Sequence, residues 1–400
     1  MERFLSVSSA VRIHAGDGAL RQLSAEATRV GAQRAFIVCG DSVATRTRLL
    51  DQLRDVLGSR YAGGYEAMRK DAPLEDVEDA ARSARAAEAD LLIAVGAGSV
   101  LKATRVLAIA LGEARPLVEL ATRYPEHGSP VSPRLMAAKP AIFNVLTAAT
   151  SAQNRAGAAL RRADGGPRLE FFDPKTRPAA IFWDSDALAT APPALARSTG
   201  LGVFWRALMS RGALSQANPL VQASRLHAYT LAHAALPRLA DPQDIGARVD
   251  MCAAALLQNR DEDDGGRPFD VHWVARAVYA LGAALFNRLP ALDQGSTHAL
   301  LTAPALLHFG ALCPDAVMQM GAALGVPDVA HDKERAVADA VEAIFAGLDV
   351  PARLPFIDAA TRAAVLEAAL YNFNADRTRE LAGHADRLAA MLTDAIGAEA

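Results

Sequence analysis

Residues 90–111 read DLLIAVGAGSVLKATRVLAIAL, and this stretch decides the expected fold. The apolar run Asp90–Val95 has the length and composition of a buried strand. It leads directly into the turn Gly96–Ser99 and then into a helical pattern over 100–111. Glycines in such a turn let backbone N–H groups approach a phosphate, and the helix N-terminus adds partial positive charge. A tight turn selected only for packing would look the same, so both interpretations stay open.

Similar units recur over the first 185 residues. Apolar runs over 34–39, 141–146 and 179–183 are further strand candidates. Helical patterns over 45–57 and 74–88 separate them. Strands that alternate with helices predict βαβ units and a mainly parallel sheet.

The pattern changes after residue 184. From Pro192 onward the chain is rich in Ala and Leu, helical in pattern and interrupted by prolines. The stretch 261–267 (DEDDGGR) is expected to form an exposed turn between two helices. We therefore expect an α/β Rossmann-like nucleotide-binding domain over 1–185 and an all-α domain over 186–400.

Composition excludes several function classes. Half of the 400 residues are apolar (51%), 22% are charged, and the net charge is −3 with both signs interspersed. This balance gives no electrostatic footprint for nucleic acid or for an anionic membrane. The three cysteines, Cys39, Cys252 and Cys313, are scattered and form no metal or disulfide motif. With no secretory leader pattern and no apolar run of membrane-spanning length, we expect a cytoplasmic protein.

Several segments also resemble, in chain order, one known family. Residues 13–20 are similar to its opening turn, 67–73 to a stretch that ends in proline, and 96–99 to its Gly-Gly-Gly-Ser diphosphate loop. Later similarities cover 146–152, 173–184, 198–201, 298–308 and 372–377. The family is that of iron-containing (group III) alcohol dehydrogenases, with its maleylacetate reductase branch. It shares its architecture with dehydroquinate synthase, whose lyase chemistry is a less favoured alternative because its Glu and His metal ligands are not found here.

The resemblance implies a fold and a cofactor. It implies an N-terminal NAD(P)-binding domain, a helical C-terminal domain, a catalytic cleft between them, a small-molecule substrate and a homodimer. The cofactor-binding candidates are Asp41, Gly96, Ala97, Gly98, Ser99, Thr147, Ala148, Ser151 and Arg168. An acidic Asp41 after the first predicted strand would bind ribose hydroxyls and repel a 2′-phosphate, which favours NAD over NADP. An N-cap role for Asp41 is weighed equally.

The metal site that the resemblance implies is largely lost. Relatives hold a divalent ion with one Asp and three His, and the corresponding positions here are Gly202, Arg206, Ala275 and His298. A further histidine of the family becomes Tyr279. One imidazole does not anchor a divalent ion, for which three or four ligands are needed. Arg206 would place a permanent cation where the ion should lie. We therefore expect no metal.

Two hypotheses follow. The first is a metal-free NAD(P)-dependent reductase of a small carbonyl or activated alkene. In it, Arg206 stabilises charge on a substrate oxygen or binds a carboxylate, Tyr279 or His298 supplies the proton, and His272 lines the cleft. The second is a catalytically inactive homologue that serves as a binding or scaffold subunit. A salt-bridging structural role for Arg206 remains the alternative at that position.

Overall fold

A computed structural model describes residues 3–125, 130–164, 166, 168–267, 269, 271–348 and 350–397. They divide into two compact units. Residues 9–192 form one unit, and residues 193–400 together with 1–8 form the other. The expected division at 185/186 therefore falls seven residues earlier than the observed change of unit, because the short helix α7 (Ser185–Ala189) stays with the first.

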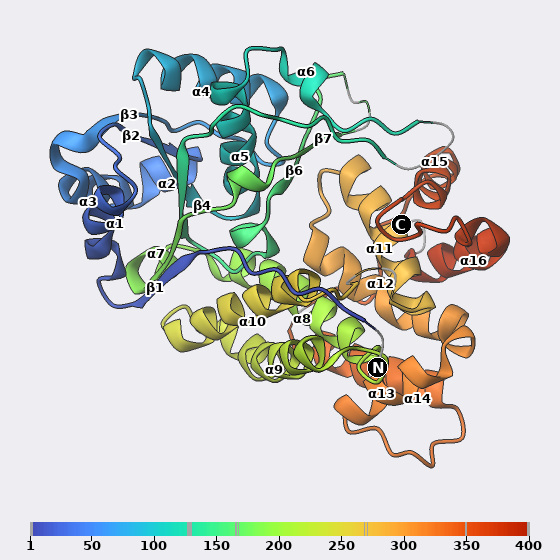
Figure 1. Cartoon of the computed structure of the whole chain (residues 1–400). Coiled ribbons are helices and arrows are strands. Elements are labelled where there is room, and N and C mark those ends of the chain that lie inside the picture. Colours follow the sequence, from blue (N-terminus) through green and yellow to red (C-terminus); the bar gives the residue numbers. More distant parts are fainter. Residues whose placement is uncertain are drawn as a thin grey trace. The chain divides into compact units, whose positions relative to one another are not determined.

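The first unit is built on a six-stranded, all-parallel sheet (Figure 1). Its strands, in spatial order, are β1 (Arg12–Gly16), β8 (Ala180–Asp184), β5 (Ala141–Leu146), β4 (Leu91–Gly96), β2 (Ala35–Cys39) and β3 (Tyr61–Tyr65). Every residue of β2, β4 and β8 is buried, as the continuous apolar runs predicted. The predicted α/β class and parallel sheet are confirmed.

Helices cover both faces of this sheet. The helices of the unit besides α7 are α1 (Leu23–Arg29), α2 (Asp41–Arg46), α3 (Leu49–Leu57), α4 (Leu74–Ala86), α5 (Gly98–Gly112) and α6 (Leu117–Leu120). Apolar residues of α1 and α3 share one core cluster with β2, β4, β5 and β8. Helix α5 packs against β4 and against α4. A separate antiparallel pair, β6 (Gly157–Leu160) and β7 (Leu169–Phe172), was not predicted.

The single helix predicted over 45–57 is wrong. Two helices, α2 and α3, occupy this region because the backbone of Thr47 is extended. The Thr47 hydroxyl donates to the carbonyl of Val43 at 2.7 Å and accepts from the N–H of Leu49 at 3.3 Å. A threonine that bonds to nearby backbone in this way competes with helix continuation.

The second unit is all helical, as predicted. Its helices are α8 (Pro193–Arg211), α9 (Pro219–Ala235), α10 (Ile245–Asp263), α11 (Trp273–Arg288), α12 (Gln294–Phe309), α13 (Pro314–Ala323), α14 (Lys333–Ala346), α15 (Ala359–Leu370) and α16 (Ala385–Ala395). Helix α12 packs against α8, α11, α14 and α16 and so lies at the centre. Gly202 and Gly295 let α8 and α12 approach closely, since a Cβ on Gly295 would overlap the Ser198 carbonyl.

Two details of this unit differ from expectation. The N-terminal residues belong to it because the N–H of Val7 bonds to the carbonyl of Asp263 (2.8 Å) and Ser6 bonds to Asp264 (2.7 Å). The exposed turn predicted over 261–267 is also wrong at its start. Helix α10 continues to Asp263, and Asp261 is only 1% exposed because it pairs with Arg225. In the part of the chain that the structure describes, no helix is both long and apolar enough to cross a membrane.

Candidate functional site

The glycine turn connects β4 to the first residue of α5. Gly96 has a φ of +154°, and a Cβ there would stand 3.0 Å from Val100 Cγ2, so only glycine fits. Ala97 is the N-cap of α5, and Gly98 opens the helix. Thr147 donates its backbone N–H to the carbonyl of Gly96 at 3.2 Å, which brings the second predicted loop to the same edge of the sheet. Backbone N–H groups at the start of α5 are thus available to an anion.

A third segment joins this edge through Ser99. The backbone N–H of Asp71 donates to Ser99 Oγ at 3.0 Å, and Arg168 forms an ion pair with Asp71 at 3.1 Å. Sequence reasoning selected Ser99 and Arg168 but missed Asp71. The structure therefore connects the glycine turn to Thr147 through Gly96 and to Arg168 through Asp71, which lies in the segment before Pro73.

The loop after β5 is fixed by a buried arginine on α5. Arg105 donates to the carbonyls of Leu101, Ala152, Arg155 and Gly157. Burial lowers the pKa of Arg105 to about 9, with added repulsion from Arg155 and Arg177. These bonds hold the region that contains the other two predicted loop residues. Ala148 is buried, and Ser151 begins the 3-10 turn Ser151–Asn154.

Asp41 lies directly after β2. It is exposed and is the first residue of α2, while Gly40 occupies the N-cap position without a side-chain cap. The capping role weighed for Asp41 is therefore not the one observed. A role in ribose binding stays a prediction.

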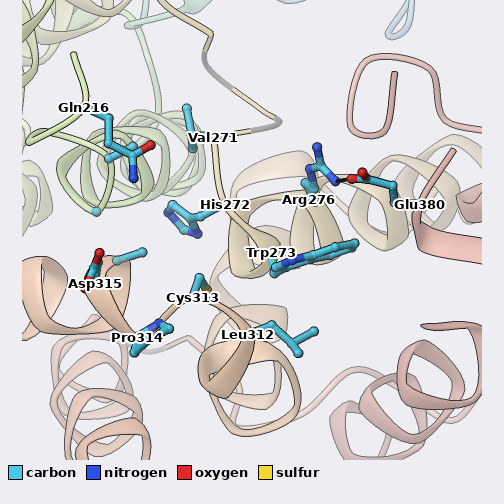
Figure 2. A pocket seen from close by; sticks show the side chains of 13 residues that line it. Gln216, Val271, His272, Trp273, Arg276, Leu312, Cys313, Pro314, Asp315 and Glu380 are labelled. Atoms are coloured by element: carbon cyan, nitrogen blue, oxygen red, sulfur yellow. Dashed lines mark hydrogen bonds and ion pairs between the residues drawn. The ribbon is translucent and has the colours of Figure 1, made fainter. Parts of the chain in front are cut away.

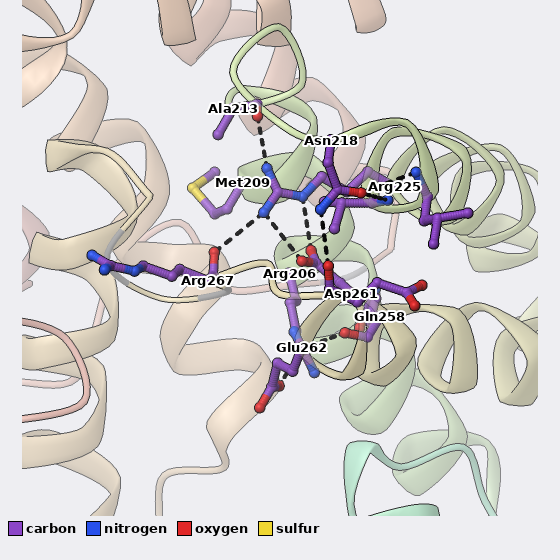
Figure 3. Close-up of polar contacts among 12 residues, drawn as sticks. Arg206, Met209, Ala213, Asn218, Arg225, Gln258, Asp261, Glu262 and Arg267 are labelled. Atoms are coloured by element: carbon purple, nitrogen blue, oxygen red, sulfur yellow. Dashed lines mark hydrogen bonds and ion pairs between the residues drawn. The ribbon is translucent and has the colours of Figure 1, made fainter. Parts of the chain in front are cut away.

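In the helical unit, Arg206 is a buried cation, and Figure 3 shows its side chain beside Glu262. Its side chain is 4% exposed. Its Nη1 donates to Asn259 Oδ1 at 2.9 Å, and its Nη2 donates to the Gln258 carbonyl at 2.5 Å and to Glu262 Oε1 at 2.7 Å. The guanidinium also lies 5.3 Å from the centre of the Phe269 ring. It does not point into bulk water.

His298 and Tyr279 belong to an aromatic cluster. The His298 ring lies 4.1 Å from the Trp205 ring and 5.8 Å from the Tyr279 ring, and Tyr279 stacks on Phe269 at 4.1 Å. His298 is fully buried, and among the described residues neither ring nitrogen has a hydrogen-bond partner. Burial lowers the pKa of His298 to about 3, so the ring is neutral at pH 7. Tyr279 is only partly buried.

His272 caps a helix instead of presenting a free nitrogen. Its Nδ1 accepts from the N–H of Ala275 at 3.3 Å, so Nε2 carries the proton and donates to the carbonyl of Met209 at 2.9 Å. Burial lowers the pKa of His272 to about 4. The ring lines a pocket of about 360 Å³ with Trp273, Arg276 and Cys313 (Figure 2). An acid or base role for His272 would require breaking both bonds.

The donor set does not fit the divalent ion that the resemblance implies. The four corresponding positions hold Gly202, Arg206, Ala275 and His298, which together offer one imidazole and one guanidinium. Hydrogen-bond donors repel a cation, and a single nitrogen ligand is too few. Among the described residues, no group of three or more His, Cys, Asp or Glu side chains is placed to hold a metal ion elsewhere.

Comparison with known proteins indicates which protein family the chain resembles. Residues 10–185 match the model of the iron-containing alcohol dehydrogenase family. Maleylacetate reductase 2 of Cupriavidus pinatubonensis is 29% identical over 248 residues, which are 62% of this chain and 60% of that protein. The maleylacetate reductase of Burkholderia cepacia is 26% identical over 333 residues, covering 82% of this chain and 81% of the other. These similarities support membership of the iron-containing alcohol dehydrogenase and maleylacetate reductase family.

A solved structure gives the same fold. The NADH-dependent butanol dehydrogenase A of Thermotoga maritima superposes with a TM-score of 0.81 over 99% of each chain, at 15% identity. The homologues support an NAD(P)-linked oxidoreductase of the alcohol dehydrogenase or maleylacetate reductase type.

Proposed function

We propose that this chain is an NAD(H)-linked reductase that works without a divalent metal ion. Hydride passes from the nicotinamide to a small carbonyl compound or to an alkene conjugated to a carboxylate. The observation that carries the proposal is the buried guanidinium of Arg206 at a position where relatives are expected to hold an ion. A fixed cation stabilises developing negative charge without needing ligands of its own.

The contacts of Arg206 would allow a substrate anion to take the place of the Glu262 carboxylate. Of the three acceptors named above, Asn259 and the Gln258 carbonyl are buried, whereas the Glu262 side chain is 35% exposed. A substrate carboxylate or enolate oxygen would replace Glu262 at Nη2 and pair with the guanidinium. Glu262 would then act as a counter-ion that holds Arg206 in place while the site is empty.

Tyr279 is the better proton donor of the two predicted candidates. The fully buried imidazole of His298 has a pKa of about 3, so it is neutral at pH 7 and is not protonated to act as an acid. Tyr279 is partly buried and stacked between Phe269 and Trp205, with ring centres 4.1 and 6.4 Å away. In this proposal the hydride adds to carbon and the Tyr279 hydroxyl protonates the resulting enolate or alkoxide.

Substituting Arg206 tests the proposal. With NADH and a panel of small aldehydes and conjugated oxo-acids that includes maleylacetate, Arg206→Ala should lower kcat/KM at least about 100-fold. NADH affinity should stay within about twofold, because the guanidinium acts on the substrate. Arg206→Lys should be intermediate, since an ammonium keeps the charge but not the planar fork. The control is Arg288→Ala, which removes an exposed cation from α11. Full activity in Arg206→Ala would refute this mechanism.

The second candidate is a catalytically inactive homologue. Its supporting observation is that Arg206 already has three acceptors and needs no ligand to be satisfied. NADH and NADPH titrations followed by fluorescence and thermal shift separate the two. Saturable binding supports the reductase, whereas no binding at millimolar dinucleotide supports the inactive homologue.

A further inference from the structure

Two buried arginines of the helical unit contact the last turns of α10 (Figure 3). The side chains of Arg206 and Arg225 are each 4% exposed. The acceptors that α10 presents to them differ in charge. Arg225 meets the carboxylate of Asp261, whereas Nη1 of Arg206 meets the uncharged amide of Asn259 at 2.9 Å.

Arg225 shows how this chain satisfies a structural arginine. The Asp261 carboxylate is 1% exposed and accepts from Nε at 2.8 Å and from Nη2 at 3.2 Å. The carbonyls of Ala213 and Arg267 accept further bonds from the same guanidinium. A buried cation is tolerated when a buried carboxylate and additional hydrogen bonds match it in this way. Arg225 therefore needs no ligand.

Asn259 holds Arg206 without neutralising it. Asn259 is 4% exposed, so its position is fixed, and an amide oxygen carries no net charge. Nη2 of Arg206 donates to a second neutral acceptor, the Gln258 carbonyl, and to Glu262, whose side chain is 35% exposed. These contacts of α10 thus combine two fixed neutral acceptors with one carboxylate that water reaches. The fixed acceptors set the plane of the guanidinium, and the exposed carboxylate is the contact that can be exchanged.

An aspartate at position 259 would have nearly the same shape. It would accept the same bond more strongly, because a hydrogen bond between two charged groups is shorter and stronger than one to an amide. It would also place a permanent negative charge against the guanidinium and so compete with any incoming anion. The amide gives up that stronger bond and leaves the positive charge of Arg206 to act on a ligand.

We propose that Asn259 is a positioning residue: it fixes the Nη1 edge of Arg206 as a neutral acceptor, so that the Nη2 edge binds a carboxylate of the substrate in exchange for Glu262. This inference rests on the proposed function and narrows it to small carboxylates. A carboxylate matches the guanidinium fork in shape and charge and replaces Glu262 like for like. An uncharged aldehyde is a weaker acceptor and leaves the Glu262 ion pair in place.

Binding measurements on the whole chain test this role without turnover. Calorimetry with and without NAD⁺ would use malonate as the anionic probe and malonamide as its uncharged match. Asn259→Asp should weaken malonate binding at least about tenfold, because a fixed carboxylate then competes for the guanidinium. Asn259→Ser stays neutral and should lose only about threefold. Asn287→Asp makes the same chemical change at an exposed position of this unit and should leave the affinity unchanged.

Thermal melting separates this role from a purely structural one. A carboxylate beside a buried guanidinium should make Asn259→Asp at least as stable as Asn259→Ser, although it is the weaker binder of malonate. A residue needed only for packing would give the same order in both measurements. Glu262→Gln removes the exchangeable carboxylate and should strengthen malonate binding about threefold. In turnover, Asn259→Asp should raise KM for conjugated oxo-acids more than it lowers kcat, because a bound substrate still meets the same guanidinium.

Several results would overturn this inference. They are an unchanged malonate affinity in Asn259→Asp, weaker binding in Glu262→Gln, equal binding of malonamide and malonate, and no malonate binding to the wild-type chain. Failure of Asn259→Asp to fold would count equally, since the added carboxylate should stabilise a buried cation. Turnover that needs Arg206, with malonate affinities that ignore Asn259, would sink the inference and leave the proposed function standing. Malonate binding that Asn259→Asp abolishes, in a chain without turnover, would do the reverse.

Discussion

Gly282 lies directly against His298: a Cβ atom on Gly282 would stand 2.4 Å from Cδ2 and 2.8 Å from Nε2 of the imidazole. Gly282 is inside α11, where glycine costs about 1 kcal/mol relative to alanine. The missing side chain of Gly282 makes room for His298, whose ring nitrogens have no hydrogen-bond partner among the described residues. Two locally unfavourable features therefore meet at one contact.

The first prediction concerns this contact. Gly282→Ala should destabilise the chain by about 1–3 kcal/mol, because overpacking against a ring held by Trp205 outweighs the gain in helix propensity. The control is Gly347→Ala, where an added Cβ meets only ordinary contacts of 3.5 and 3.6 Å at a helical φ of −66°. It should be neutral or slightly stabilising. Urea unfolding of both variants measures the difference, and a stabilised Gly282→Ala would contradict the packing.

Acid sensitivity is the second prediction. Burial lowers the pKa of His298 to about 3 and of His272 to about 4, from an ordinary value of 6.5. Between these values and 6.5 the unfolded chain binds more protons than the folded one, so stability falls as pH falls. Each histidine should remove up to about 1.4 kcal/mol per pH unit below 6.5. Unfolding free energies from pH 8 to pH 5 measure the slope.

The substitution His298→Met separates the contributions of His298 and His272 to the loss of stability at low pH. An apolar side chain removes a buried imidazole without leaving a new unsatisfied group, so little stability should be lost at pH 8. The slope below pH 6.5 should become shallower, because one of the two titrating groups is gone. A slope equal to that of the wild-type chain would show that His298 is not responsible.

The third prediction concerns the pair between Arg225 and Asp261. Arg225 Nε lies 2.8 Å from Asp261 Oδ2, with side chains 4% and 1% exposed, and Arg225 also donates to the carbonyls of Ala213 and Arg267 (Figure 3). Asp261→Ala leaves an uncompensated buried cation and should cost about 3–5 kcal/mol. The comparison is Asp244→Ala, which breaks a partly exposed pair with Arg238 and should cost less, although Asp244 also caps α10. Equal losses would contradict this difference.

Metal dependence provides the fourth prediction. Because the site offers one imidazole and one guanidinium, purified protein should contain well below one divalent ion per chain by elemental analysis. Excess chelator should leave both turnover and thermal stability unchanged. One equivalent of iron or zinc whose removal abolishes activity would rule out the metal-free proposal.

Local sequence patterns were enough to predict the inner strands of the sheet. Strands β2, β4, β5 and β8 were predicted because buried parallel strands are continuous apolar runs, and the glycine turn was predicted because it follows such a run. The edge strands β1 and β3 were missed. Their sequences, RIHAG and YAGGY, are partly exposed and poor in branched apolar residues, so they pair only because β8 and β2 are already in place.

By itself the sequence determined the α/β and all-helical halves and the glycine turn, since each depends on residues close together in the chain. Only the tertiary structure decided what the charged side chains do. Arg206 meets Gln258 and Glu262 more than 50 residues away, Arg225 meets Asp261 inside the core, and Asp71 meets Arg168. Charge pairing depends on distance in space and on exclusion of water, and periodicity along a chain specifies neither.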